Sequence, residues 1–132
     1  MLIKLNKIHL LVRNSPLLIV LGEPNSIFSE ILFKTYKKKI IQRFNRPIVI
    51  IGSENLLKLQ MKFLKYSIKI RKINILDLKK LNLNKEYLNI INVNYEFNKV
   101  FNKISNNSNR YINNCFKIAL KLLKEKICLC FN

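Results

Sequence analysis

The residues best placed to do chemistry in this chain follow its first long apolar run. The run over 17–21 gives way to Gly22, Glu23 and Pro24. Turns at the carboxyl ends of strands in open α/β sheets face ligands, and a glycine lets the backbone approach them closely. We therefore interpret these three residues as a ligand-adjacent turn, with a plain tight turn as the alternative. The turn has neither G-x-G-x-x-G nor G-x-x-x-x-G-K-[ST], so it specifies no particular cofactor.

Other catalytic chemistry has little support in the sequence. The seven carboxylates are scattered, and a single histidine, His9, lies in a stretch without periodicity. No pair of carboxylates and no Ser/His/acid or Cys/His set can be assembled from them. Cys115, Cys128 and Cys130 are an odd number in a chain without a secretory signal, so we expect apolar packing and no disulfide framework. We predict no catalytic residue and no metal ligand here.

The net charge of +18 over 132 residues could suit a nucleic acid or an anionic membrane surface. The lysines are spread along the whole chain, however, and the 20 Lys, 20 Ile and 19 Asn against one Ala indicate compositional bias. Only five of the 25 basic residues are arginine, so nucleic-acid binding is not expected. No apolar run approaches the roughly 20 residues that span a bilayer, and we expect a cytoplasmic protein without a membrane partner.

Two strand–turn–helix units position the turn. The continuous apolar run over 17–21 is typical of a strand covered on both faces. Asn25 or Ser26 is expected to cap the following helix, with Glu30 in its first turn and lysines over 37–39 at its end. The residues expected on its buried stripe are Ile27, Phe28, Ile31 and Leu32.

The same unit recurs around Gly52. Pro47 opens a strand over 48–51, and Ser53 caps the next helix. The helically spaced residues of that helix are Leu56, Leu57, Gln60, Met61 and Leu64. A third strand is expected over 67–73, nearer an edge because its apolar residues alternate with basic ones. Two such units ending in a strand predict α/β/α layers around a mostly parallel sheet with right-handed crossovers.

The sequence pattern is less regular over the remainder of the chain. A short helix and a loop are expected over 74–86, a strand over 87–93 and a last strand over 127–131, while 1–15 is a terminal segment. Ser105 or Ser108 would cap the clearest helix of the chain. The apolar positions of that helix are Ile112, Cys115, Phe116, Ala119, Leu122 and Leu123.

Several of these segments resemble the 4-hydroxythreonine-4-phosphate dehydrogenases. Residues 18–30, LIVLGEPNSIFSE, are similar to that family's opening strand and its G-[DE]-P-A-G-I-G-P-E turn. Residues 46–53, RPIVIIGS, resemble its R-P-[VI]-[VI]-[VI]-G-D strand, and 56–73 resemble the helix and I-x-I-x-x-I strand that follow. Residues 105–112, SNNSNRYI, resemble its S-x-x-[NS]-G-R-Y-[VI] motif at the start of a long helix.

The resemblance covers 17–73 and 105–132 and implies a two-domain, homodimeric dehydrogenase. Such enzymes use NAD(P) and a divalent metal to oxidise the hydroxyl of 4-phosphooxy-threonine, whose product then loses its carboxylate on the route to pyridoxal phosphate. The family holds its metal with histidines, and the substrate phosphate with basic residues, that come later in its longer chains. His9 matches none of them.

The resemblance therefore predicts that 16–132 is the amino-terminal α/β portion of such an enzyme, truncated at its carboxyl end. We expect it to bind neither NAD(P) nor the metal well by itself and to be inactive alone. The turn also departs from the family pattern, because 25–30 lacks both glycines and the second proline. Asn109 replaces the glycine before Arg110, a milder change since Asn tolerates the left-handed region.

Two alternatives remain open. A small stand-alone basic α/β module would bind an anionic partner such as nucleic acid, with steep salt dependence. A structural protein without a ligand would show neither dehydrogenase activity nor binding of an anionic partner. The dehydrogenase portion would instead expose a sheet edge and depend on a partner.

Overall fold

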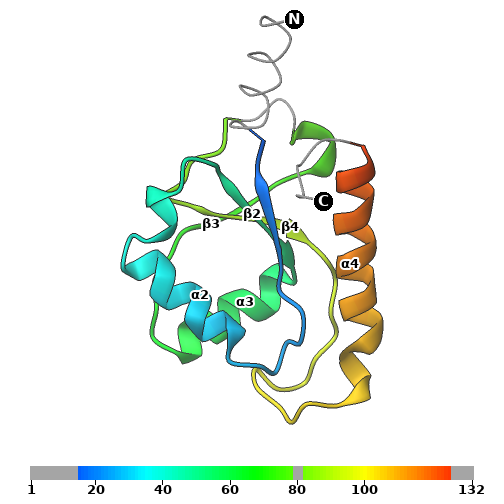
Figure 1. The fold of residues 1–132 in the computed structure, drawn as a ribbon. Helices are drawn as coiled ribbons and strands as arrows, with labels where there is room; N and C mark the ends of the chain where they lie inside the picture. The colour runs from blue at the N-terminus through cyan, green and yellow to red at the C-terminus, as the bar shows by residue number, and fades with distance from the viewer. Residues whose placement is uncertain (1–14, 79–81, 126–132) are drawn as a thin grey trace, which may run out of the picture.

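The computed structural model describes residues 15–78 and 82–125, which form a parallel sheet between two helical layers (Figure 1). The strands are β1 (Leu17–Val20), β2 (Ile48–Gly52), β3 (Ile70–Lys72) and β4 (Leu88–Asn92), in the order β1-β2-β4-β3. The helices are α2 (Phe28–Lys37), α3 (Glu54–Phe63) and α4 (Asn109–Lys124), joined by the 3-10 turns η1 (Ile41–Arg43), η2 (Ile75–Asp77) and η3 (Asn106–Ser108). All three strand pairings are parallel. The predicted α/β/α architecture is confirmed.

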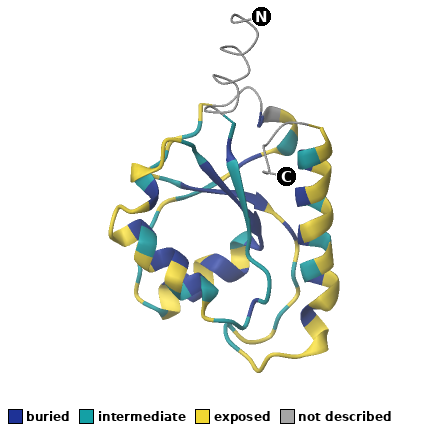
Figure 2. Ribbon diagram, in the orientation of Figure 1, coloured by how far each residue is buried: buried dark blue, intermediate teal, exposed yellow. Residues whose placement is uncertain are grey.

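The central strand β2 is buried along its whole length, because it carries apolar side chains on both faces. Ile48 and Ile50 pack against α2 and α3, whereas Val49 and Ile51 pack against α4. The register aligns Ile50 with an isoleucine on each neighbouring strand, Ile19 on β1 and Ile90 on β4. Figure 2 shows the buried residues gathered on the sheet and on the helix faces that cover it.

The predicted stripe on α2 is partly wrong. Ile27 and Ile31 are 71% and 47% exposed, while Leu32 is buried as expected. The residues that α2 buries are Ser29, Leu32, Phe33 and Tyr36. The helix is therefore rotated by about one residue from the expected stripe, which corresponds to roughly 100°. The sequence allowed both stripes, and the larger Phe33 and Tyr36 take the core positions.

The capping predictions have mixed outcomes. Ser53 accepts a hydrogen bond from the Leu56 N–H at 3.3 Å and caps α3 as expected. Ile27 is the residue that precedes α2, and the Ser26 hydroxyl accepts from the Phe28 N–H at 3.2 Å. Ser108 precedes α4 but makes no capping hydrogen bond with its side chain, because its backbone is already helical and not extended.

The later elements also match in part. Strand β3 lies at an edge as predicted but is shorter than 67–73, and β4 falls within 87–93. No further described strand pairs with the outer edges of β1 and β3. On α4 the buried residues are Tyr111, Cys115, Ala119 and Leu122, whereas Phe116 is 50% exposed, contrary to prediction. The strand expected over 127–131 and most of the 1–15 segment lie outside the described residues.

Cys115 is a free, fully buried cysteine, which confirms its expected apolar packing. Burial raises the pKa of its thiol.

None of the described helices combines the length and apolar character needed to cross a bilayer.

Helix α4 approaches the end of β2 closely because Gly52 has no side chain. A Cβ atom at this position would lie against the Leu21 side chain and 2.9 Å from the Tyr111 hydroxyl oxygen. Tyr111 is buried and Leu21 packs against the core from a partly buried position, so an added methyl group would displace packed side chains.

We expect Gly52→Ala to lower the free energy of unfolding by about 1–3 kcal/mol, because the added methyl group overpacks this contact. Urea unfolding monitored by circular dichroism measures the change. Ala119→Gly, on the same side of the sheet, is a control for general loss of core packing and should leave the Tyr111 contact intact. Gly52→Ala with wild-type stability would contradict the close approach.

Candidate functional site

The candidate site lies at the carboxyl ends of β1 and β2, where the chain turns from β1 towards α2. Gly22 has a φ of +66°, in the left-handed region that favours glycine. No atom would lie within 4 Å of a Cβ at this position, so the backbone conformation, and not space, requires glycine. Pro24 is buried behind it. The structure thus brings Gly22, Glu23 and Pro24 to the sheet edge where the sequence placed them.

Glu23 organises this turn with both its side chain and its backbone. Its Oε1 accepts from the Asn25 N–H at 3.1 Å, and its carbonyl accepts from the Ser26 N–H and hydroxyl at 3.2 and 2.9 Å. Its Oε2 accepts from the Ser108 hydroxyl at 2.8 Å, which joins residues 85 positions apart. Because the acceptor is a carboxylate, this last bond belongs to the stronger class of hydrogen bonds. Glu23 therefore fixes the turn to the start of α4.

The amide side chains of Gln60 and Asn25 connect the same turn to other parts of the chain. Gln60 on α3 is buried, and its Nε2 donates to the carbonyls of Pro24 at 2.8 Å and Val100 at 3.2 Å. The Asn25 Oδ1 accepts from the Asn102 N–H at 2.9 Å. The turn after β1 and the long connection from β4 to α4 are therefore held in one arrangement.

The end of β2 is fixed by Tyr111. Its hydroxyl accepts from the Ser53 N–H at 2.8 Å, and its ring packs on Tyr95 with 4.6 Å between the centroids. Burial raises the pKa of the Tyr111 hydroxyl well above its ordinary value. Burial and the nearby Glu23 carboxylate raise the pKa of Tyr95.

A small cavity lies under the turn. Its volume is about 20 Å³, and Glu23, Ser29, Gln60 and Tyr111 are among its lining residues. The Ser29 hydroxyl is buried there without a hydrogen-bond partner. Such a volume holds one water molecule and nothing larger.

The described residues do not fit a dinucleotide or a metal ion. The N–H groups of Asn25, Ser26 and Phe28 already have partners within the turn, so they form no ready cradle for a pyrophosphate. In the part of the chain that the structure describes, no group of three or more His, Cys, Asp and Glu side chains could hold a metal.

Sequence reasoning missed three residues that build this site. Gln60 was visible as a polar residue within an apolar stripe, a signal for a buried side chain with a specific partner. Ser108 was considered only as a helix cap, although it binds Glu23. Tyr111 was noted within a motif, but its bond to the Ser53 N–H depends on the close approach at Gly52.

Two solved structures are similar to this chain. A 4-hydroxythreonine-4-phosphate dehydrogenase from Burkholderia phymatum matches with a TM-score of 0.72 and 16% identity, over 86% of this chain and 34% of that one. A putative 4-hydroxythreonine-4-phosphate dehydrogenase from Salmonella typhimurium matches with a TM-score of 0.70 and 17% identity, over 87% and 35%. The chain shares its fold with these dehydrogenases. It spans about a third of their length. Neither the protein-family models nor the curated proteins match this sequence.

We expect Tyr111→Phe to lower the free energy of unfolding by about 1–3 kcal/mol, because it leaves the buried Ser53 N–H without its acceptor. Urea unfolding at neutral pH measures this loss. Tyr95→Phe is the matched control, since no described residue hydrogen-bonds to the Tyr95 hydroxyl. An equal loss in the two variants would contradict the special role of the Tyr111 hydroxyl.

Proposed function

We propose that this chain forms one wall of the active site of an NAD(P)-dependent dehydrogenase that acts on 4-phosphooxy-threonine. The observation that carries the proposal is the hydrogen bond between Glu23 and Ser108. These residues belong to the two segments, 18–30 and 105–112, that resemble the dehydrogenase motifs. The segments are far apart in sequence but meet at the carboxyl edge of a sheet whose fold the solved dehydrogenases share.

In this proposal the described residues shape and support the site. Both carboxylate oxygens of Glu23 accept hydrogen bonds from within the protein, which suits a positioning residue better than a proton acceptor for substrate. Gly22 and Pro24 form part of the turn, and the buried Gln60 side chain donates a hydrogen bond to the Pro24 carbonyl. The substrate would lie against the outer side of this turn.

The hydride acceptor NAD(P) and the divalent metal would be held by parts of an enzyme other than the described residues. The described chain has neither a pyrophosphate cradle nor a metal-ligand cluster, so it supplies the rigid wall against which such parts close. A homodimer and a cytoplasmic location belong to the same proposal.

The test is an assay of NAD(P) reduction with 4-phosphooxy-threonine and Mg²⁺. We expect no turnover from this chain alone, and turnover when a companion polypeptide supplies the histidines and basic residues that the resemblance assigns to the rest of the enzyme. Ser108→Ala should lower kcat/KM of the combination by about tenfold, because Glu23 then no longer fixes the turn. Ser105→Ala, which removes a nearby hydroxyl that does not contact Glu23, is the control.

Turnover by this chain without a companion would contradict the proposed division of the site. A companion that binds the chain and still gives no turnover would contradict the dehydrogenase proposal itself.

A further inference from the structure

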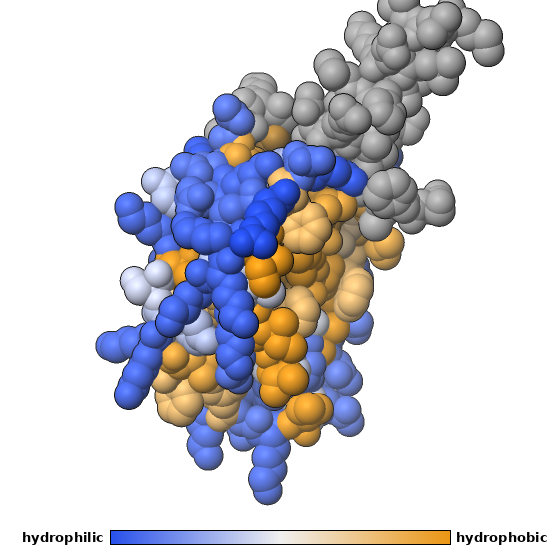
Figure 3. All heavy atoms as spheres, turned by 60° about the vertical axis from the view of Figure 1, so that its left-hand side comes forward, coloured by the Kyte–Doolittle hydropathy of each residue, from blue (hydrophilic) through white to orange (hydrophobic). Residues whose placement is uncertain are grey.

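A second concave feature lies at the opposite end of the sheet, by the amino ends of β3 and β4. It is a groove of about 710 Å³ between the carboxyl-terminal ends of α2 and α3 and the segment that leads into β4. Lys37, Lys39, Lys65 and Lys69 are among its lining residues. Figure 3 shows long hydrophilic side chains beside an apolar strip on the side of the molecule that carries α2. The volume lies within the roughly 300–1,000 Å³ of small-molecule sites.

Two of these lysines occupy backbone positions that normally belong to glycine. Lys39 and Lys65 have φ values of 57° and 59°, and they are the only described residues other than glycine with a positive φ. Each follows a helix that ends in the same way. The Lys39 and Ile40 N–H groups bond to the carbonyls of Tyr36 and Thr35.

The end of α3 repeats this pattern, with the Lys65 and Tyr66 N–H groups bonded to the carbonyls of Lys62 and Met61. This is the Schellman motif, in which glycine is the usual left-handed residue. A side chain at that position costs free energy, and such strain clusters at ligand sites. The attraction of the helix dipole for lysine favours the last turn, but it does not require the left-handed position. Both strained lysines line the same groove.

The groove carries an excess of positive charge. Lys37 and Lys69 lie over the rings of Tyr66 and Tyr87, with 5.7 and 6.0 Å from the ammonium to the ring centroid. Within the described residues, no carboxylate pairs with these two lysines or with Lys65. The rings hold the ammonium groups without neutralising them.

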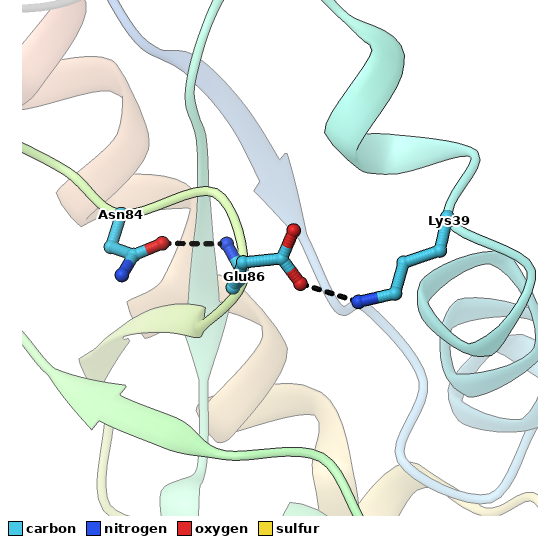
Figure 4. Close-up of polar contacts among 3 residues, drawn as sticks. All are labelled: Lys39, Asn84 and Glu86. Carbon is cyan, nitrogen blue, oxygen red and sulfur yellow. Dashed lines mark hydrogen bonds and ion pairs between the residues drawn. The ribbon is translucent and has the colours of Figure 1, made fainter.

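The one carboxylate that lines the groove is Glu86, which pairs with Lys39 (Figure 4). Its backbone N–H donates to the Asn84 side chain at 2.9 Å, which fixes the segment before β4. Glu86 therefore occupies the position on Lys39 that an anionic ligand would take.

One further lining residue has an unused polar atom. Gln42 lines the groove, and its Oε1 is buried without a hydrogen-bond partner. Buried acceptors of this kind are rare in proteins and call for a donor. A ligand in the groove could supply a donor to this oxygen only after the Gln42 side chain turns towards it, because the atom is closed to solvent.

We propose that this groove binds a nucleotide-sized phosphorylated compound, whose phosphates contact Lys39 and Lys65 and displace Glu86. A single-stranded nucleic acid fits less well, because its bases would need aromatic faces for stacking. Of the three tyrosines that line the groove, Tyr66 and Tyr87 already carry a lysine and Tyr36 is buried. The proposal is independent of the dehydrogenase function, which uses the other end of the sheet.

The test measures binding of adenosine diphosphate and of inorganic pyrophosphate by calorimetry, with the full chain. We expect Lys65→Gly to weaken adenosine diphosphate binding about tenfold, because a charge-assisted hydrogen bond is lost. The same change should raise the melting temperature by about 4 °C, because glycine relieves the left-handed strain. Weaker binding by a more stable variant cannot result from unfolding.

Three further variants make the test more specific. Glu86→Gln should tighten binding several-fold, because the ligand no longer competes with a carboxylate for Lys39. Lys117→Ala removes the same charge from the exposed face of α4, on the other side of the sheet, and should leave affinity unchanged. Ser108→Ala should also leave it unchanged, which separates this groove from the proposed dehydrogenase site.

Three outcomes would overturn the proposal. The first is no binding of either probe. The second is an equal loss of affinity in Lys65→Gly and Lys117→Ala, which would indicate only general attraction to a basic protein. The third is an oligothymidylate that binds far more tightly than adenosine diphosphate at physiological salt, which would indicate a nucleic-acid surface.

Discussion

The close contact between α4 and the end of β2 fixes the geometry of everything at the carboxyl edge of this sheet. Gly52 leaves room for the Tyr111 hydroxyl to reach the Ser53 N–H. Ser108 lies three residues before Tyr111, so it lies near the same face of the helix start, and it reaches Glu23. The missing side chain at Gly52 therefore allows the close approach of α4 to the sheet, and the turn after β1 lies against the start of this helix.

The architecture was largely predictable because β1 and β2 are continuous apolar runs and the amphipathic helices keep their period. Ser53 as a cap, β4 within 87–93 and the edge position of β3 all follow from local chemistry. The rotation of α2 was not predictable, since Ile27 and Ile31 offered an apolar stripe as plausible as the one that Phe33 and Tyr36 form. Tertiary packing decided between them.

The position of the site could be predicted from the sequence, but the hydrogen bonds that hold it together could not. The glycine and the strand end located the turn that contains Glu23, whereas the partner of the Glu23 side chain was not predicted. Its bond to Ser108 joins residues 85 positions apart, and no local pattern encodes such a contact. The groove at the amino ends of β3 and β4 could not be predicted from the sequence for a different reason. Its lysines are a small part of a strong compositional bias, and only the backbone angles of Lys39 and Lys65 distinguish them.

Glu23 and Ser108 hold the turn after β1 in place through a direct hydrogen bond. A double-mutant cycle on the free energy of unfolding, with Glu23→Gln, Ser108→Ala and the double variant, tests it most directly. We predict a coupling energy of about 1–3 kcal/mol, as expected for a hydrogen bond to a carboxylate. The pair Glu30→Gln and Ser108→Ala should be additive. A coupling energy near zero between Glu23 and Ser108 would contradict the account.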